Sequence, residues 1–174
     1  KKELLERSGY TSAVLEGLLK RGILESYEKE VGRLQVSVCR LQEPNPLSPA
    51  QEKAYGEIHE AFKTKEVCLL HGVTSSGKTE IYVRLIHEVL RLGRQVLYML
   101  PEIAITTQIT ERLAKLFGDK LLVYHSKFSD NERVEVWNKL LHNDEPMLVL
   151  GVRSSLFLPF KDLGLIIVDE EHEN

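Results

Sequence analysis

The chain has few cysteines and no long apolar run. Its 174 residues contain two cysteines, Cys39 and Cys68, which lie far apart and have no C-x-x-C partner. This spacing speaks against a structural zinc site and against a disulfide framework. Apolar runs such as residues 163–168 fall far short of the roughly 18 residues that a membrane helix needs. No signal peptide is recognisable at the start. We therefore expect a reduced, cytoplasmic protein with no membrane partner.

An excess of positive charge is also lacking. The sequence has 23 basic and 26 acidic side chains, a formal net charge of −3. It therefore lacks the overall basic signature that is typical of nucleic-acid-binding domains. With 43% hydrophobic and 28% charged residues, the composition is that of a globular chain and not of a disordered one. Because the sequence starts at Lys1 in helix-like sequence and stops just after an acidic cluster, we expect a fragment of a longer protein.

Two segments and a linker are indicated. Residues 1–42 carry two short helical patterns, the second ended by Gly22, and then an alternating stretch that suits a small strand pair. That order is typical of a winged helix, although a generic helical hairpin fits the pattern equally well. Pro44 and Pro46 predict a linker over residues 43–47, because neither a helix nor a central strand tolerates such spacing. Residues 48–174 form the second segment.

In that second segment, helical patterns alternate with short apolar strands. Capping-box patterns open two of the helices, at Ser48 with Gln51 and at Ser129 with Glu132. Five alternations with short connections predict an α/β fold, with a parallel sheet and helices on both faces. The expected strands are residues 67–70, 96–100, 121–124, 147–150 and 163–168, and the expected helices are near residues 48–62, 81–90, 109–116 and 129–140.

A phosphate-binding loop follows the first expected strand. Residues 72–79 read G-V-T-S-S-G-K-T and match the pattern G-x-x-x-x-G-K-[ST], between a strand and a helix as the motif requires. In such a loop, backbone N–H groups and the helix N-terminus point at phosphate oxygens. Lys78 can neutralise the β- and γ-phosphates, and the hydroxyl of Thr79 can ligate Mg²⁺. We assign ATP binding to Gly72, Thr74, Ser75, Ser76, Gly77, Lys78 and Thr79.

An acidic cluster follows the last apolar strand. Residues 169–172 read D-E-E-H. A buried strand can fix Asp169 beside the phosphate loop, where its carboxylate can hold the water shell of Mg²⁺. Glu170 can then orient or activate the attacking water. An apolar strand that ends in acids is a weak signal by itself, but together with the phosphate loop it predicts hydrolysis of Mg·ATP. The predicted catalytic residues are Lys78, Asp169 and Glu170. The predicted metal ligands are Thr79 and Asp169.

Several segments resemble one helicase family. Residues 169–172 have the D-E-x-H form of superfamily-two helicases. Further matching segments are P-E-I-A-I-T at 101–106, H-S at 125–126, G-V-R-S-S-L-F-L-P-F at 151–160 and L-G-L-I-I-V-D-E-E-H at 163–172. In this order, residues 48–174 resemble the first RecA-like lobe of the PriA family (primosomal protein N′). Residues 1–42 resemble the winged-helix segment that precedes the helicase core in that family.

The resemblance implies an ATP-driven 3′-to-5′ DNA helicase that acts at abandoned replication forks. It implies DNA contacts for Thr106, Arg153 and Ser154, whose chemistry suits sequence-neutral phosphate binding; a helix N-cap at Thr106 and a surface ion pair at Arg153 are the alternatives. It assigns coupling to a second motor lobe to His172. Gln51 resembles the glutamine that reads adenine in such motors, but it also stands where a capping-box glutamine belongs.

The partners implied are forked or single-stranded DNA, single-stranded DNA-binding protein and primosome loading proteins. The family's second lobe and zinc module have no counterpart in this sequence, so we expect the chain by itself to unwind nothing. Ser75 stands where the family's loop usually carries glycine, which bears on nucleotide affinity. Two alternatives are a P-loop small-molecule kinase, which usually needs an arginine-rich lid, and a non-catalytic DNA-binding module that uses only the winged helix.

Overall fold

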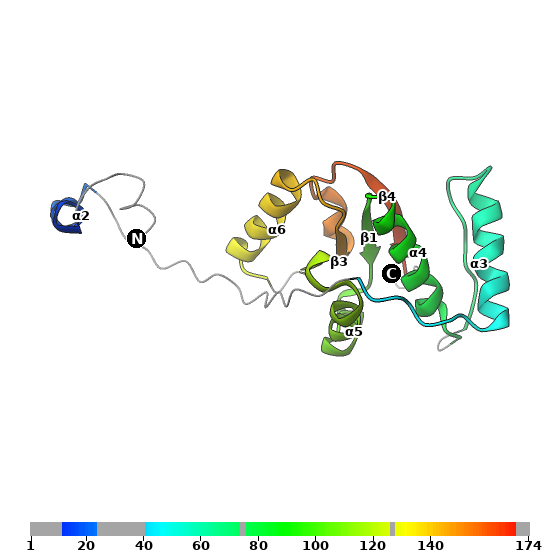
Figure 1. The fold of residues 1–174 in the computed structure, drawn as a ribbon. Helices are drawn as coiled ribbons and strands as arrows, with labels where there is room; N and C mark the ends of the chain where they lie inside the picture. The colour runs from blue at the N-terminus through cyan, green and yellow to red at the C-terminus, as the bar shows by residue number, and fades with distance from the viewer. Residues whose placement is uncertain (1–11, 24–40, 74–75, 126–127, 170–174) are drawn as a thin grey trace. The chain divides into compact units, whose positions relative to one another are not determined.

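The computed structural model describes residues 12–23, 41–73, 76–125 and 128–169 (Figure 1). The chain forms two compact units, residues 1–33 and 34–174. In the first unit, helix α2 spans Ser12–Lys20, and Gly22 follows it with a φ of 66°. Backbone N–H groups of Gly22 and Ile23 donate to Leu19 and Leu18, the pattern of a glycine-terminated helix end. The predicted stop at Gly22 is confirmed, whereas the first helical pattern and residues 24–38 of the predicted strand pair lie outside the described residues.

A parallel sheet forms the centre of the second unit. Its strands are β1 (Gln95–Met99), β2 (Leu121–Tyr124), β3 (Leu148–Gly151) and β4 (Leu163–Val168). Their order in the sheet is β2-β3-β1-β4, and every pairing is parallel. Met99, the last residue of β1, pairs with Gly151 and with Val168. The segments that follow these three strands therefore leave the sheet at one common edge.

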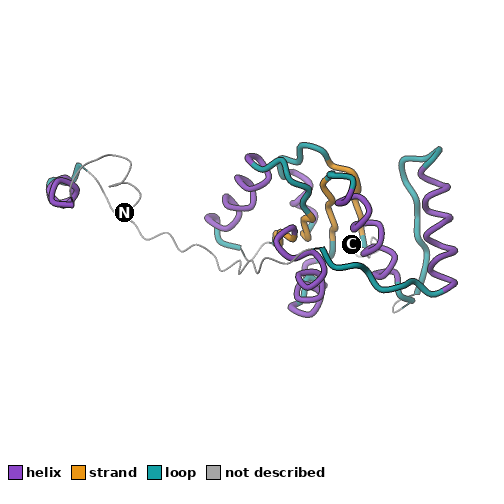
Figure 2. Tube along the Cα trace, viewed as in Figure 1, coloured by secondary structure: helices purple, strands orange, loops and turns teal. Residues whose placement is uncertain are grey.

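An α-helix precedes each of β1, β2 and β3 along the chain, and a short 3₁₀ turn joins β3 to β4 (Figure 2). The four α-helices of the second unit are α3 (Pro49–Phe62), α4 (Lys78–Arg91), α5 (Thr107–Phe117) and α6 (Asp130–His142). Three short 3₁₀ turns complete the described elements: η1 (Glu102–Ala104), η2 (Gly118–Lys120) and η3 (Arg153–Phe157). The predicted capping boxes at Ser48 and Ser129 are both present.

Successive residues of a strand point to opposite faces of the sheet, so both faces present apolar side chains that helices can cover. On one face, residues such as Tyr98 and Leu150 pack with Ile86 of α4 and Leu113 of α5. On the other face, the buried residues are Leu97, Leu122, Val136, Leu140, Met147, Val149 and Leu158, which join α6 to the sheet. The predicted α/β architecture, a RecA-like lobe with helices on both faces, is thereby confirmed.

Helix α3 packs against α4 through a smaller apolar cluster (Figure 1). Ile58 of α3 is buried with Ile81 and Leu85 of α4. The segment before α3 also contacts this unit: the Gln42 N–H donates to the Leu116 carbonyl at 2.9 Å, and Glu43 forms an ion pair with Arg91 at 3.5 Å. These contacts hold the segment before α3 against α4 and α5.

One predicted strand is wrong. Residues 67–70 have no strand pairing in the structure. The side chains of Val67 and Leu69 are 82% and 78% exposed, whereas Cys68 and Leu70 pack against the α3–α4 cluster. Only every second residue of this apolar run therefore meets the core. The sequence predicts a short buried strand here, but the run packs against the α3–α4 cluster on one side and pairs with no strand.

No helix among the described residues is long and apolar enough to cross a membrane. The described cysteine, Cys68, is a half-buried free thiol. Cys39 lies outside the described residues.

Candidate functional site

The phosphate loop runs directly into the start of α4. Gly77 is the N-cap residue of this helix and has a φ of 83°, a left-handed conformation that favours glycine. Because glycine has no side chain, the first N–H groups of α4 receive no side-chain cap. Uncapped N–H groups at a helix N-terminus form a site for an anion such as phosphate.

Lys78 and Thr79 are the first two residues of α4, and both are half-buried. The Lys78 ammonium donates to the Gly72 carbonyl at 2.6 Å, so its side chain folds back over the loop that precedes it. This hydrogen bond places the positive charge of Lys78 beside Gly72, the first residue of the phosphate loop. The structure therefore brings three predicted phosphate ligands, Gly72, Gly77 and Lys78, to one place.

Gln51 contacts the same loop from α3. Its side-chain oxygen accepts the Ser48 N–H at 2.8 Å, and its side-chain nitrogen donates to the Gly77 carbonyl at 3.1 Å. A Cβ at Gly77 would clash with that nitrogen, so a second reason for glycine there is the close approach of Gln51. The capping interpretation of Gln51 is confirmed, and its amide nitrogen has a further role on the phosphate loop that the sequence did not indicate.

Asp169 directly follows β4 and is held at the common edge of the sheet. Its N–H donates to the Met99 carbonyl at 3.0 Å, which continues the β1–β4 pairing by one residue. Its carboxylate accepts the hydroxyl of Tyr98 at 3.1 Å and the hydroxyl of Tyr82 at 3.5 Å. Tyr82 belongs to α4, the helix that begins with Lys78. A hydrogen bond thus connects the phosphate-loop helix to the acidic end of β4.

Sequence reasoning missed both tyrosines. Tyr82 and Tyr98 stand at buried positions of a helix and a strand, and the sequence motifs assign them no role. One signal was available: a buried tyrosine carries a hydroxyl that usually needs a partner. Burial and the Asp169 carboxylate raise the pKa of Tyr82 to about 12 and raise that of Tyr98 as well. At neutral pH both hydroxyls are therefore protonated and can donate.

The residues expected to contact DNA lie at the same edge of the sheet. Thr106 precedes α5, and its hydroxyl accepts the Ile109 N–H at 3.5 Å. Arg153 and Ser154 belong to η3, which follows β3. All three side chains are exposed. The N-cap interpretation of Thr106 is thus present in the structure, and the exposed positions leave all three side chains accessible to a ligand.

These residues fit a magnesium nucleotide. Mg²⁺ prefers oxygen ligands and is often held by one or two carboxylates together with substrate phosphates. Thr79 and Asp169 offer such oxygens, while the open start of α4 and Lys78 offer donors for phosphate. Among the described residues, no three His, Cys, Asp or Glu side chains cluster as in an all-protein metal cage. Thr74, Ser75, Glu170 and His172 were also predicted for the site, and they lie outside the described residues.

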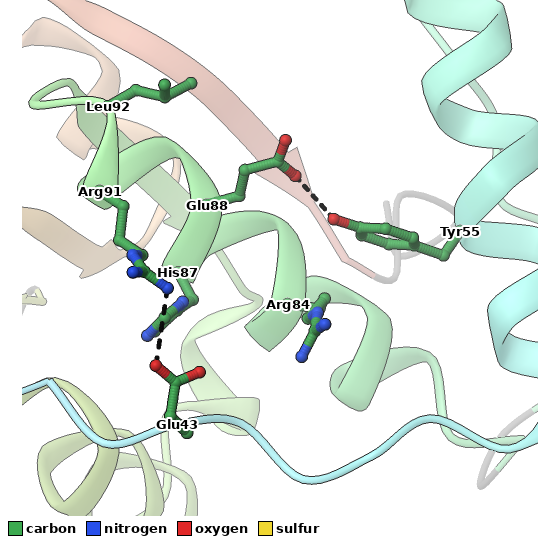
Figure 3. Close-up of a pocket in the computed structure, with 7 residues that line it drawn as sticks. All are labelled: Glu43, Tyr55, Arg84, His87, Glu88, Arg91 and Leu92. Atoms are coloured by element: carbon green, nitrogen blue, oxygen red, sulfur yellow. Dashed lines mark hydrogen bonds and ion pairs between the residues drawn. The ribbon is translucent and has the colours of Figure 1, made fainter.

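A separate cavity of about 310 Å³ lies between α3, α4 and the segment that precedes α3 (Figure 3). It is polar, and none of the residues predicted to bind nucleotide or DNA lines it. Tyr55 donates to Glu88 across it at 2.7 Å, and burial raises the pKa of Tyr55 to about 12. Burial also lowers the pKa of His87 in its wall. The lining residues are Glu43, Tyr55, Arg84, His87, Glu88, Arg91 and Leu92.

Comparison with known families gives two matches. The model of the DEAD/DEAH box helicases matches residues 48–174. A model described as the winged helix domain of PriA helicase from Bacteroidota matches residues 1–31. The first match covers the whole sheet and its helices, and the second covers α2.

Individual relatives agree with these matches. The replication restart protein PriA of Bacillus subtilis (strain 168) is 41% identical over 99% of this chain and 22% of its own length. That of Synechocystis is 40% identical over 99% of this chain and 21% of its own length, and that of Helicobacter pylori (strain J99) is 46% identical over 74% and 20%. The chain therefore spans about a fifth of the length of the curated relatives it matches. By its lobe and its N-terminal match, the chain belongs to the DEAD/DEAH box helicases and, within them, to the PriA family.

Proposed function

We propose that this chain is the winged-helix segment and first motor lobe of an ATP-dependent 3′-to-5′ DNA helicase that acts in replication restart. The observation that carries the proposal is the link from the phosphate-loop helix to Asp169. The Tyr82 hydroxyl of α4 donates to the Asp169 carboxylate, which supports a Walker-type site whose two halves would share one edge of the sheet. The helicase match over residues 48–174 supports the same conclusion and gives the kinase alternative no support.

In this proposal, Lys78 and the start of α4 bind the phosphates of ATP. Thr79 and Asp169 hold Mg²⁺, and Glu170 orients the attacking water. Mg²⁺, when bound, would neutralise charge that develops on the phosphate oxygens. Gln51 caps α3 and holds the loop through the Gly77 carbonyl, and reading of adenine by Gln51 remains a second proposal for the same side chain.

DNA is proposed to bind along the edge where β1 and β3 end. Thr106, Arg153 and Ser154 would contact its phosphates without reading its sequence. His172 would couple the nucleotide site to the second motor lobe. We propose residues 1–42 as a DNA-binding winged helix and residues 43–47 as the linker. The proposed partners are forked or single-stranded DNA, single-stranded DNA-binding protein and primosome loading proteins, in the cytoplasm.

The test is ATP hydrolysis stimulated by forked DNA, measured in the full-length protein. We expect Lys78→Ala to reduce it at least about a hundredfold, because removing a preorganised charge at a phosphoryl-transfer site costs several kcal/mol. Lys53→Ala is the matched control. Lys53 is an exposed lysine of α3 that pairs with Glu57 at 3.9 Å, and its loss should leave the rate unchanged.

Unchanged hydrolysis in Lys78→Ala would end the motor proposal. DNA binding that persists without any ATP hydrolysis in the wild-type protein would favour the non-catalytic alternative. For residues 1–174 alone we expect weak nucleotide binding, little hydrolysis and no unwinding, since motors of this class hydrolyse ATP between two lobes.

A further inference from the structure

Two elements of the fold, β1 and α4, each direct a hydroxyl at the carboxylate of Asp169. Tyr98 belongs to β1 and donates to one carboxylate oxygen at 3.1 Å. Tyr82 belongs to α4 and donates to the other at 3.5 Å. Asp169 itself is tied by its N–H to Met99. Each carboxylate oxygen therefore has a hydroxyl donor from a different element of the fold.

Both tyrosines are held firmly by their surroundings. Tyr98 is 1% exposed and Tyr82 is 8% exposed. Their rings meet edge to face, with centroids 5.7 Å apart and planes at 65°, which is a favourable arrangement for aromatic pairs. Because side chains in a close-packed interior rarely change rotamer without disturbing neighbours, the two hydroxyls are directed at fixed points. They restrict rotation of the Asp169 carboxylate.

Tyr82 also has a fixed relation to the predicted metal ligand on α4. It follows Thr79 by three residues, and residues three apart on a helix lie on the same face, with Cβ atoms about 5–6 Å apart. One helix therefore presents both the Thr79 hydroxyl and a hydrogen bond to Asp169. The two proposed oxygen ligands of Mg²⁺ come from different elements: Thr79 from α4 and Asp169 from the end of β4. The hydrogen bond from Tyr82 to Asp169 joins these two elements.

We propose that Tyr82 and Tyr98 are positioning residues, which hold the Asp169 carboxylate relative to Thr79 and so set the affinity of the nucleotide site for Mg²⁺. This inference rests on the proposed function. Hydrogen-bond partners of metal ligands orient those ligands, and their removal typically costs about 10–100-fold in metal affinity or activity. Neither tyrosine contacts nucleotide or metal in this proposal.

The experiment is an equilibrium titration of Mg²⁺ in the full-length protein, with a fluorescent ATP analogue as the probe. Tyr82→Phe and Tyr98→Phe remove one hydroxyl each and keep the ring. We expect each to raise the half-saturating Mg²⁺ concentration about three- to tenfold, and the double variant to raise it further. Affinity for the analogue in EDTA should change less than about twofold, because the phosphate loop is untouched.

Tyr55→Phe is the matched control, because Tyr55 also donates its hydroxyl to a carboxylate, that of Glu88, at 2.7 Å. Its removal should leave the Mg²⁺ dependence unchanged. Melting temperatures of all variants separate positioning from a general loss of stability. A half-saturating Mg²⁺ concentration that stays at the wild-type value in the double variant would overturn the inference, and so would an equal rise in Tyr55→Phe.

Failure of the proposed function has a different signature. Lys78→Ala is titrated alongside the tyrosine variants. If it binds the analogue as the wild-type protein does, the nucleotide site itself is misassigned and the inference falls with it. If Lys78→Ala abolishes binding while both tyrosine variants titrate like the wild type, only the positioning role is lost.

Discussion

The two flanks of the lobe are built in different ways. On the flank of α3 and α4, polar side chains reach across the fold, as in the bonds from Gln51 to Gly77 and from Tyr82 to Asp169. At the start of α6 on the other flank, the capping box of Ser129 and Glu132 is a local set of hydrogen bonds. The packing there is apolar. Both flanks bury apolar side chains, and the flank of α3 and α4 adds long-range polar contacts around the proposed site.

The two capping boxes make this difference concrete. Ser48 with Gln51 and Ser129 with Glu132 use the same local geometry to start α3 and α6. A carboxylate can only accept hydrogen bonds, whereas an amide also donates. Gln51 therefore caps its helix with the oxygen and binds the phosphate loop with the nitrogen. Glu132 caps its helix with bonds from Ser129, and those bonds lower the pKa of its carboxyl.

The largest stability effect is expected on the apolar flank. Leu140 of α6 is fully buried between the helix and the sheet. Leu140→Ala should lower the free energy of unfolding by about 2–5 kcal/mol, because it removes buried methyl groups and leaves a cavity. Denaturant unfolding of the chain measures this loss.

Leu141→Ala is the control for Leu140→Ala. Leu141 is the next residue on the same helix and is 41% exposed, so we expect a loss below about 1 kcal/mol. Similar losses in the two variants would mean that burial against the sheet does not stabilise this flank.

A smaller effect, on binding rather than stability, is expected at the first capping box. Gln51→Glu keeps an oxygen to accept the Ser48 N–H but replaces the donor to Gly77 with a negative charge near the phosphate site. We expect nucleotide affinity to fall about tenfold, the equivalent of one hydrogen bond to a backbone group. Binding of a fluorescent ATP analogue measures the change.

Glu132→Gln is the reciprocal exchange in the other capping box, and we expect it to leave nucleotide affinity unchanged. The proposed difference between the flanks would be wrong if both exchanges lowered nucleotide affinity by the same factor. It would also be wrong if Gln51→Glu bound the analogue as tightly as the wild-type chain.

The smallest effects are expected from removing the cap hydroxyls. Ser129→Ala and Ser48→Ala should each destabilise the chain by about 1 kcal/mol, the usual cost of losing an N-cap side chain. Only Ser48→Ala should also weaken nucleotide binding, because its partner Gln51 holds the phosphate loop. Thermal unfolding with and without the ATP analogue distinguishes the two variants, and a ligand-dependent difference in Ser129→Ala would contradict the local role of that box.

Much of the fold could be predicted because its signals are local. Capping boxes at Ser48 and Ser129 and the stop at Gly22 depend on residues within a few positions, and the structure contains all three. The short strand expected at residues 67–70 was wrong, because an apolar run of four residues cannot show whether its backbone finds a pairing strand.

The residues of the candidate site also divide into those that local motifs predict and those that only the tertiary structure brings together. The sequence by itself determined the phosphate loop, the start of α4 and the acidic end of β4, because each is a short motif whose chemistry is carried by neighbouring residues. Only the tertiary structure decided that the Gln51 amide reaches Gly77 and that Tyr82 and Tyr98 meet at Asp169. These contacts join residues that are 26, 87 and 71 positions apart. The packing of the helices and strands decides which distant side chains meet, and a local sequence pattern does not specify that packing.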